Sequence, residues 1–434
     1  MSLPAPEPPT RARFVLILWL CGLAGILYLD RVCLSQAVEP MQKELGLTNP
    51  QMGYVMMAFT LAYGLFEIPT GRLGDRFGSR NVLTRIVVWW SVCTALTGVC
   101  TGFGTLIAVR FLFGAGEAGA YPNAARVVSR WFPLGERGRA QGAMLCAAQT
   151  GSAVSPAIAA YLIEGVGWRW AFGAFGLVGL VWAVGFWLWF RDDPAVHSHV
   201  NEAELGIIRD SAPAPATDPG PVPWRAVLTN RGIIVLGFIT ICGAFYTYLF
   251  YSWFPKYLSA ARGIENREAG WLSSFVLAGS AVGVCLGGWV ADRITHRAAG
   301  PVQARRHLGV GCYLTSAGCL FAGARCDNPW ALAGLFSLAF CLMHITLPNW
   351  WSVAIPQCGR HVGSLFGLMN GVGVVGAMSS QGFVGEFSAW RASQGYSGRA
   401  QWDPLFDVYV GVLIAGAIGW FLYQATPLEG EATD

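Results

Sequence analysis

Four charged side chains lie inside long apolar stretches of this sequence, where they could bind an anion or carry a proton. Asp30 and Arg31 are adjacent near the end of one stretch, and Arg110 and Glu117 share another. A charge at the middle of a membrane helix costs about 2.5–3.5 kcal/mol on translocon scales, so each charge needs a partner or a function. Two cations and two anions can neutralise one another completely.

Helical geometry predicts the directions of these side chains. Arg110 and Glu117 are nearly two turns apart, so both face the same way, about 10 Å apart along the axis. Tyr28 and Arg31 share one helix face, while Asp30 is rotated by about 100° from Arg31. We expect Asp30 to pair with Arg110, which leaves Arg31 able to bind a substrate carboxylate. Glu117 is then without a fixed cation and could load and release a proton.

A permanent ion-pair network that serves only helix packing is the alternative interpretation of these four charges. Glu67 raises the same question, but it lies one turn before a polar loop and fits a gate as well as a proton site. His344 fits a pocket residue, a second proton site or a buried neutral imidazole, and we favour the last.

The elements that must position these charges are predicted to be membrane helices. The chain of 434 residues is 54% hydrophobic and 12% charged, with a mean hydropathy of +0.46, whereas soluble domains carry roughly a quarter charged residues. Apolar runs of roughly 20 residues, which cross a bilayer as helices, recur along the chain. We expect an all-α membrane protein with twelve transmembrane helices at 14–38, 51–70, 82–101, 104–128, 140–162, 170–190, 232–255, 269–290, 307–324, 330–352, 362–384 and 405–424.

A proline-rich polar segment, residues 191–231, divides the chain into two predicted six-helix bundles at 1–190 and 232–434. An internal repeat supports this division. The stretch Gly71-Arg-Leu-Gly-Asp75-Arg76-Phe-Gly-Ser-Arg80 is echoed by Gly288-Trp-Val-Ala-Asp292-Arg293-Ile-Thr-His-Arg297, each after the second helix of its half. Parallel repeats of six helices suit a transporter that binds substrate between two rocking halves.

The distribution of charge indicates orientation and does not indicate nucleic-acid binding. Although the net charge is +4, the arginines gather in alternate breaks between apolar runs, so the positive-inside rule places both termini in the cytoplasm. The twelve cysteines are scattered singly, and we expect packing roles for them. His197 and His199 form a lone His-x-His in a polar segment, where a solvated loop is favoured, and we assign no metal.

The first copy of the repeat resembles the cytoplasmic loop signature of the major facilitator superfamily, G-x-L-x-D-R-x-G-x-R, at every fixed position. The resemblance implies two pseudo-symmetric six-helix bundles, the major facilitator fold. It also implies that this loop locks the cytoplasmic ends of the two halves. The implied gating residues are Gly71, Asp75, Arg76, Arg80, Asp292 and Arg293. The second copy departs from the pattern at Ala291 and Thr295.

The charged helices resemble one branch of this superfamily, the anion:cation symporters, which includes bacterial proton symporters for galactonate, glucarate and hexuronates. The resemblance rests on Tyr-Leu-Asp30-Arg31 and on Arg110-Phe-Leu-Phe-Gly-Ala-Gly-Glu117-Ala-Gly-Ala-Tyr-Pro122. It implies that Asp30 and Glu117 are protonation sites, that Arg110 is the partner of Asp30, and that Arg31 binds the anion. By position, the implied substrate-binding residues also include Tyr28, Tyr63, Gln149, Trp350 and Asn370. Packing is the alternative for Tyr63 and Trp350.

These features predict a secondary active transporter that carries a small organic anion, a sugar acid or another carboxylate, together with protons by a rocker switch. We expect a functional monomer in the bacterial inner membrane, with no cofactor besides the coupling proton and no nucleic-acid partner. An organic-anion or organophosphate exchanger is the nearest alternative, but exchangers of organophosphates typically carry an arginine in helix 7, and the stretch from Gly232 to Pro255 contains none. An enzyme or a membrane sensor would need a catalytic cluster or a signalling domain, and we expect neither.

Overall fold

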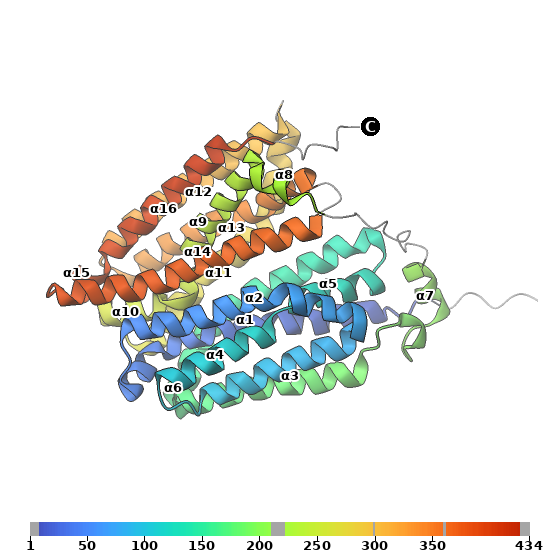
Figure 1. Ribbon diagram of the computed structural model, residues 1–434, viewed down its shortest axis with the longest axis horizontal. Helices are drawn as coiled ribbons and strands as arrows, with labels where there is room; N and C mark the ends of the chain where they lie inside the picture. The colour runs from blue at the N-terminus through green and yellow to red at the C-terminus, as the bar shows by residue number, and fades with distance from the viewer. Residues whose placement is uncertain (1–7, 210–221, 298–299, 359–361, 426–434) are drawn as a thin grey trace, which may run out of the picture.

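The computed structural model describes residues 8–209, 222–297, 300–358 and 362–425, which form helices joined by short connections (Figure 1). The helices are α1 (Ala12–Leu45), α2 (Asn49–Phe77), α3 (Ser79–Thr97), α4 (Phe103–Glu117), α5 (Ala120–Trp131), α6 (Leu134–Trp189), η1 (Pro194–Val196), α7 (Glu202–Arg209), α8 (Trp224–Thr229), α9 (Arg231–Ser252), α10 (Phe254–Arg262), α11 (Asn266–Arg297), α12 (Pro301–Arg325), α13 (Pro329–Cys358), α14 (Val362–Ser393), α15 (Gly398–Trp402) and α16 (Pro404–Leu422). The predicted all-α fold is confirmed.

Seven helical segments are long and apolar enough to cross a membrane by length and composition, namely Ala12–Leu45, Phe103–Trp131, Leu134–Trp189, Arg231–Ser252, Asn266–Ile294, Pro329–Ile355 and Gly398–Leu422. The 56-residue α6 contains two spans, because it turns at Gly167, whose φ of 79° is easily adopted only by glycine. The seven segments therefore account for eight of the predicted spans. Helices α2, α3, α12 and α14, which pack alongside them, cover the other four, so the described residues contain the twelve predicted spans.

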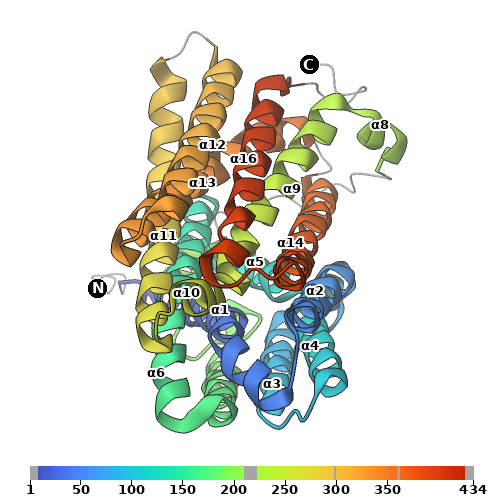
Figure 2. The ribbon, with the colours of Figure 1, turned by 90° about the vertical axis from the view of Figure 1, so that its left-hand side faces the viewer.

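The helices form two bundles, which Figure 1 shows one below the other and Figure 2 shows from one end. In the first bundle α6 packs against α1 and α3, and α2 packs against α4. In the second bundle α13 packs against α11 and α12, and α9 packs against α14 and α16. The bundles meet along two seams, where α6 contacts α11 and where α2 contacts α14.

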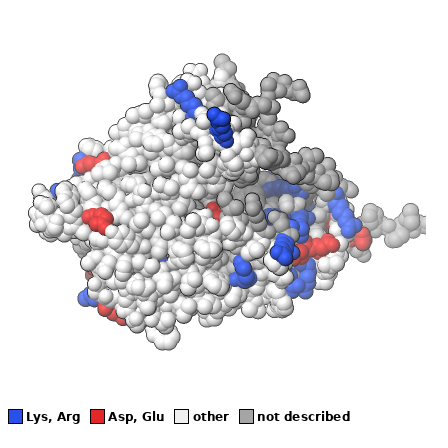
Figure 3. Space-filling model, in the orientation of Figure 1, with Lys and Arg blue, Asp and Glu red and all other residues white. Residues whose placement is uncertain are grey.

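We call the end of the molecule that holds the start of α1 and the end of α16 the terminal face, and the opposite end the distal face. Figure 3 shows a broad uncharged surface on one side of the molecule, with many of its blue side chains gathered toward the terminal face. An uncharged belt with charges displaced toward the ends is the surface that a bilayer requires.

Contacts along the α2–α14 seam begin at the distal face and reach deep into the molecule. Asn49 donates a hydrogen bond from Nδ2 to Oγ of Ser388 at 3.0 Å near the distal face. Further along α2, Asn370 Nδ2 donates to Oε2 of Glu67. Asn49 and Glu67 are about 27 Å apart along the helix axis at 1.5 Å per residue. The two halves are therefore in contact from the distal face to the level of Glu67.

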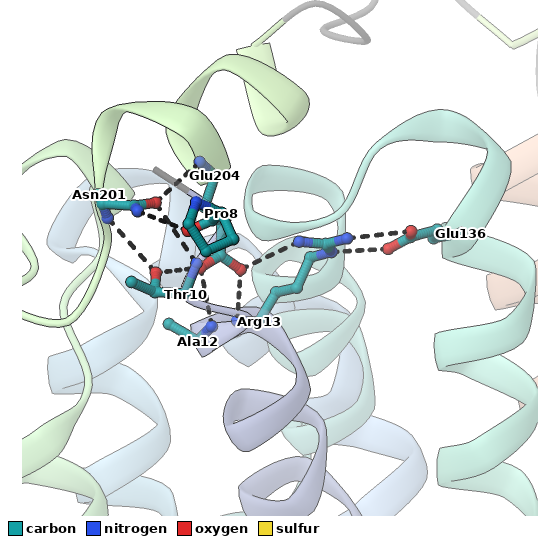
Figure 4. A network of polar contacts seen from close by, with 7 residues as sticks. All are labelled: Pro8, Thr10, Ala12, Arg13, Glu136, Asn201 and Glu204. Atoms are coloured by element: carbon teal, nitrogen blue, oxygen red, sulfur yellow. Dashed lines mark hydrogen bonds and ion pairs between the residues drawn. The ribbon is translucent and has the colours of Figure 1, made fainter. Parts of the chain in front are cut away.

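Helix α7, inside the predicted linker, is fastened to the start of α1 (Figure 4). Helix α1 begins after Arg11, whose side chain makes no capping bond. The Glu204 carboxylate instead accepts hydrogen bonds from the backbone N–H groups of Ala12 at 2.8 Å and Arg13 at 3.2 Å. Arg13 also pairs with Glu204 at 3.1 Å and with Glu136 of α6 at 2.8 Å. Because the first N–H groups of a helix lack internal partners, Glu204 caps α1 from a distant part of the chain.

The capping bonds set the acidity of Glu204. Burial by itself would raise the pKa of Glu204, but hydrogen bonds from Thr10, Ala12 and Arg13 to its carboxylate outweigh burial and lower that pKa. The first part of the linker is thus tied to the first bundle by an ionised side chain.

Candidate functional site

Arg31 of α1 and Glu117 of α4 form a buried ion pair, in which Arg31 Nε donates to Glu117 Oε1. Glu117 is fully buried, and the Arg31 side chain keeps 15% of its surface exposed. This pair corrects the expectation that Arg31 is free and that Glu117 has no fixed cation. The physical reason is desolvation, since a buried guanidinium and a buried carboxylate are each costly unless they meet.

The predicted direct pair between Asp30 and Arg110 does not form in the described part of the chain. Asp30 is 1% exposed, and neither of its carboxylate oxygens has a hydrogen-bond partner there. The Arg110 guanidinium instead lies over the rings of Phe113 and Phe172, at 5.0 and 5.4 Å from their centroids. Asp30 and Arg110 still act on each other electrostatically. The expected pair is therefore a longer-range interaction, because the aromatic faces also attract the cation.

Aromatic rings surround Arg31. Its guanidinium carbon lies 4.5 Å from the ring centroid of Tyr63 and 5.5 Å from those of Tyr28 and Phe59. Phe59 and Tyr63 are four residues apart on α2, so both rings project from one helix face. In the described structure, Arg31 Nη2 is a buried donor without a hydrogen-bond acceptor. The cation is thus held in place by Glu117 and by rings, and still has a donor that an anion could use.

The second half contributes tyrosines that the sequence analysis did not select. The ring of Tyr251 on α9 lies 6.0 Å from that of Tyr28, and Tyr248 lies 5.9 Å from Tyr251. Tyr248 also interacts electrostatically with Arg31. The signal that would have found them is a group of three tyrosines, including Tyr246, within one apolar run.

Glu67 and Asn370 join the two halves beside this cluster. Tyr63 Oη lies 3.5 Å from Glu67 Oε1, and Asn370 of α14 donates to the other oxygen of the same carboxylate. A continuous series of contacts therefore leads from Glu117 through Arg31 and Tyr63 to Glu67 and the second half. Asn370, predicted from the sequence, lies where the second half meets this series.

Three other predicted residues lie on α6 and α13. Gln149 is 3% exposed on α6, and Trp350 is partly buried on α13. Their role in substrate binding stays a prediction. The Nδ1 atom of His344 lies 2.8 Å from the carbonyl oxygen of Phe340, which fits a buried neutral imidazole that donates from Nδ1.

The predicted gating residues of the first half lie where α2 ends and α3 begins. A side chain at Gly71 would meet Pro122 at 3.3 Å, so α2 and the start of α5 are close here. The Asp75 side chain lies outside the described part, and Arg76 is exposed. Arg80 donates from Nε to the carbonyl oxygen of Trp187 at 2.9 Å. In this conformation Arg80 is therefore bonded inside its own half.

The corresponding residues of the second half, Asp292 and Arg293 on α11, are exposed. Arg293 lies over the ring of Trp289 at 5.3 Å, again within its own half. A lock between the halves made by these residues stays a prediction for another conformation.

Comparisons with known proteins find a matching family, relatives that cover most of the chain, and solved structures with the same fold. The sequence profile of the Major Facilitator Superfamily matches residues 20–380. A probable sulfoacetate transporter of Cupriavidus necator is 33% identical over 381 residues, which cover 85% of this chain and 86% of that protein. A D-galactonate transporter of Escherichia coli is 30% identical and covers 95% of this chain and 96% of its own length.

A probable galactarate/D-glucarate transporter of Bacillus subtilis is 31% identical, with 97% of this chain and 93% of that protein covered. Among solved structures, a bacterial homologue of the human lysosomal transporter Spinster superposes with a TM-score of 0.78 at 18% identity, covering 96% of this chain and 97% of that one. A D-xylose-proton symporter superposes with a TM-score of 0.75 at 14% identity, covering 97% and 100%. The expected fold and the resemblance to anion transporters are confirmed.

Proposed function

The chain belongs to the Major Facilitator Superfamily, and on that basis we propose that it is a proton-coupled symporter of a small organic anion. It is a multi-pass membrane protein of a transporter family, with relatives named as transporters of small anions. The observation that carries the proposal is the buried Arg31–Glu117 ion pair, with the unpaired carboxylate of Asp30 next to it in sequence.

The ion pair provides a direct link between proton binding and anion binding. While Glu117 is ionised, it occupies Arg31 and competes with any anion for the guanidinium. A proton on Glu117 removes that competitor, and the cation is then free to bind a carboxylate or sulfonate. When the proton leaves, Glu117 recovers Arg31 and displaces the anion. The proton and the anion therefore bind together and leave together.

Asp30 provides the second acid of this mechanism. Its carboxylate is buried and makes no hydrogen bond of normal geometry in the described structure, while the Trp90 indole and Arg110 act on it from nearby. A proton on Asp30 would leave the Arg110 charge uncompensated, and the incoming anion would restore the balance. Because each anion adds negative charge to the site, protonation of these acids keeps the loaded carrier close to neutral.

Contacts between the halves connect the loaded site to rocking. Tyr28 of α1 in the first half contacts Tyr251 of α9 in the second half, and Glu67 binds Asn370 at the α2–α14 seam. An anion at Arg31 would lie among side chains of both halves and favour the occluded arrangement. We place the terminal face in the cytoplasm of a bacterial inner membrane, since arginines concentrate on that side, and we propose that one chain suffices for transport.

The substrate class follows from the cation and from the relatives. A single guanidinium recognises one carboxylate or sulfonate group, and the phenol groups of the tyrosines provide hydrogen bonds for hydroxyls. Relatives are named for sulfoacetate, D-galactonate and galactarate/D-glucarate. We therefore propose a small sugar acid or a short sulfonate or carboxylate.

The test is uptake into proteoliposomes that contain the purified chain. An inward proton gradient should drive accumulation of at least one acid from a panel of sulfoacetate, D-galactonate and D-glucarate, and collapsing the gradient should abolish it. An unbuffered external medium should become more alkaline when the acid is added, since symport removes external protons. Uptake that ignores the proton gradient for every acid would refute the symport mechanism.

Exchange without net proton movement is the second candidate, and the same ion pair favours it. Because Glu117 gives Arg31 an internal counterion, the empty carrier is already neutralised at this position, and one anion could replace another without protons. Counterflow that proceeds at equal rate with and without a pH gradient, together with no gradient-driven accumulation, would support exchange.

A further inference from the structure

Two cysteine thiols from opposite halves of the molecule lie against each other at the α6–α11 seam. Cys146 belongs to the first half and Cys285 to the second, and their sulfur atoms are 3.5 Å apart. The cysteines that the structure describes are free thiols. We propose that Cys146 and Cys285 are an oxidation site, at which a disulfide ties the two halves together and stops the rocking that transport needs.

The geometry of the seam explains why a bond at this point would matter. Closer to the distal face, the Ala157 N–H of α6 donates to Ser274 Oγ of α11 at 3.0 Å. A side chain at Gly270 would come within 2.5 Å of Ala160, so the helices are in close contact there. Cys146 and Cys285 lie eleven residues from Ala157 and Ser274, and so about 17 Å along each helix axis. The seam is thus in contact at two levels about 17 Å apart along the helices.

A tilt of the halves must change the spacing at one of these points. A rotation of about 10° around the distal contact would move the two sulfurs apart by about 3 Å, given the 1.5 Å rise per residue. A disulfide holds the two Cβ atoms about 3.5–4.5 Å apart. Once oxidised, α6 and α11 would be held at both points, and the tilt would be blocked.

The thiols can be reached by an oxidant that dissolves in lipid. Cys285 is exposed at the surface of the chain and Cys146 is partly exposed, and both lie inside helical segments long and apolar enough to cross a bilayer. Organic hydroperoxides partition into the bilayer. One hydroperoxide and two thiols give one disulfide, one alcohol and one water, since the sulfurs lose two electrons and two protons and the O–O bond takes them up. A dithiol reductant reverses the step.

Cys21 of α1 is the competing partner, because it also lies near Cys146. A Cys21–Cys146 bond would stay within the first half and leave the rocking free. Trypsin separates the three thiols, since Cys21 falls in residues 14–31, Cys146 in 140–169 and Cys285 in 268–293, each peptide with a single cysteine. The mass of the crosslinked pair therefore identifies the bond.

The experiment treats the full chain in proteoliposomes with tert-butyl hydroperoxide and digests it without reduction. We expect the 140–169 and 268–293 peptides to be joined, and we expect dithiothreitol to release them. Hydrogen–deuterium exchange around Ala157 and Ser274 should slow in the oxidised chain and recover after reduction. Only a 14–31 to 140–169 product, or no crosslink, would overturn the proposal.

Transport provides the second readout, and this part depends on the proposed function. Initial uptake should fall by the same fraction as the fraction of chains crosslinked, and dithiothreitol should restore it. Cys146→Ser and Cys285→Ser should have normal uptake that resists the hydroperoxide, whereas Cys21→Ser should remain sensitive. Full crosslinking with unchanged uptake would mean that the pair lies at the pivot, and would refute the arrest. If the parent moves no acid of the panel, the symport proposal fails, while the mass and exchange readouts still decide the oxidation site.

Discussion

Replacing Glu117 by Gln removes the anion that neutralises Arg31 and leaves a guanidinium inside the first bundle. Breaking a buried ion pair by removing one partner typically costs about 3–5 kcal/mol. The Gln carbonyl can still accept from Arg31 Nε, and the rings of Tyr63 and Phe59 still face the cation. We therefore expect a loss near the lower end, about 3 kcal/mol, in the stability of the substrate-free protein.

The same change should strengthen the binding of an anion. In the parent, the substrate competes with Glu117 for Arg31, and in Glu117→Gln that competition is gone. Each tenfold gain in affinity adds about 1.4 kcal/mol to the stabilisation by ligand at saturating concentration. The variant should thus be less stable than the parent without ligand and should gain more stability from the same anion.

Thermal unfolding in detergent, with and without the acid that the parent transports, measures both effects. Glu164→Gln is the matched control, because Glu164 is exposed on α6 and undergoes the same chemical change. In proteoliposomes, Glu117→Gln should lose accumulation driven by a proton gradient and keep counterflow. A variant with parental stability, parental ligand shift and parental gradient-driven uptake would refute the competition between Glu117 and substrate for Arg31.

Three further predictions concern the seams and the linker. Glu204→Gln should lower the melting temperature at pH 7, and the difference from the parent should shrink on acidification. The pKa of Glu204 is lowered in the folded state, so its ionised form stabilises the fold above the unfolded-state pKa of about 4.3, and this stabilisation is lost as the pH falls through the folded-state pKa. Melting curves recorded from pH 7 to pH 3.5 test this. Lys256→Glu should loosen the distal face, where Lys256 Nζ lies 3.7 Å from Glu39 Oε2, and the charge reversal Glu39→Lys in the same chain should restore it. The effect on distal-face hydrogen exchange should stay within about 1 kcal/mol, because water screens the Glu39 side chain, which is half exposed, although Lys256 is largely buried. Gly270→Ala should cost about 1–3 kcal/mol by overpacking the α6–α11 seam, while Gly165→Ala, with open space around it, should leave the melting temperature unchanged.

Much of the architecture could be predicted because it depends on local properties of the chain. Hydropathy and length identify spanning helices wherever they pack, so the membrane-spanning helices followed from residue order alone. The division of α6 at Gly167 was anticipated as two spans for the same reason. The cysteines show the limit of this reasoning, since Cys146 and Cys285 are far apart in sequence and only the seam brings them together.

The types of residue in the site were determined by the sequence, and their partners only by the tertiary structure. The sequence placed Asp30, Arg31, Arg110 and Glu117 inside the first bundle, while the predicted common direction of the last two stays a prediction. The sequence could not choose between the possible ion pairs. An ion pair or hydrogen bond requires a donor–acceptor distance that is correct to a fraction of an ångström. Sequence reasoning leaves the distance between neighbouring helices uncertain by several ångströms. The tertiary arrangement of the first bundle gave Arg31 to Glu117, and packing of the two halves brought in the tyrosines of α9.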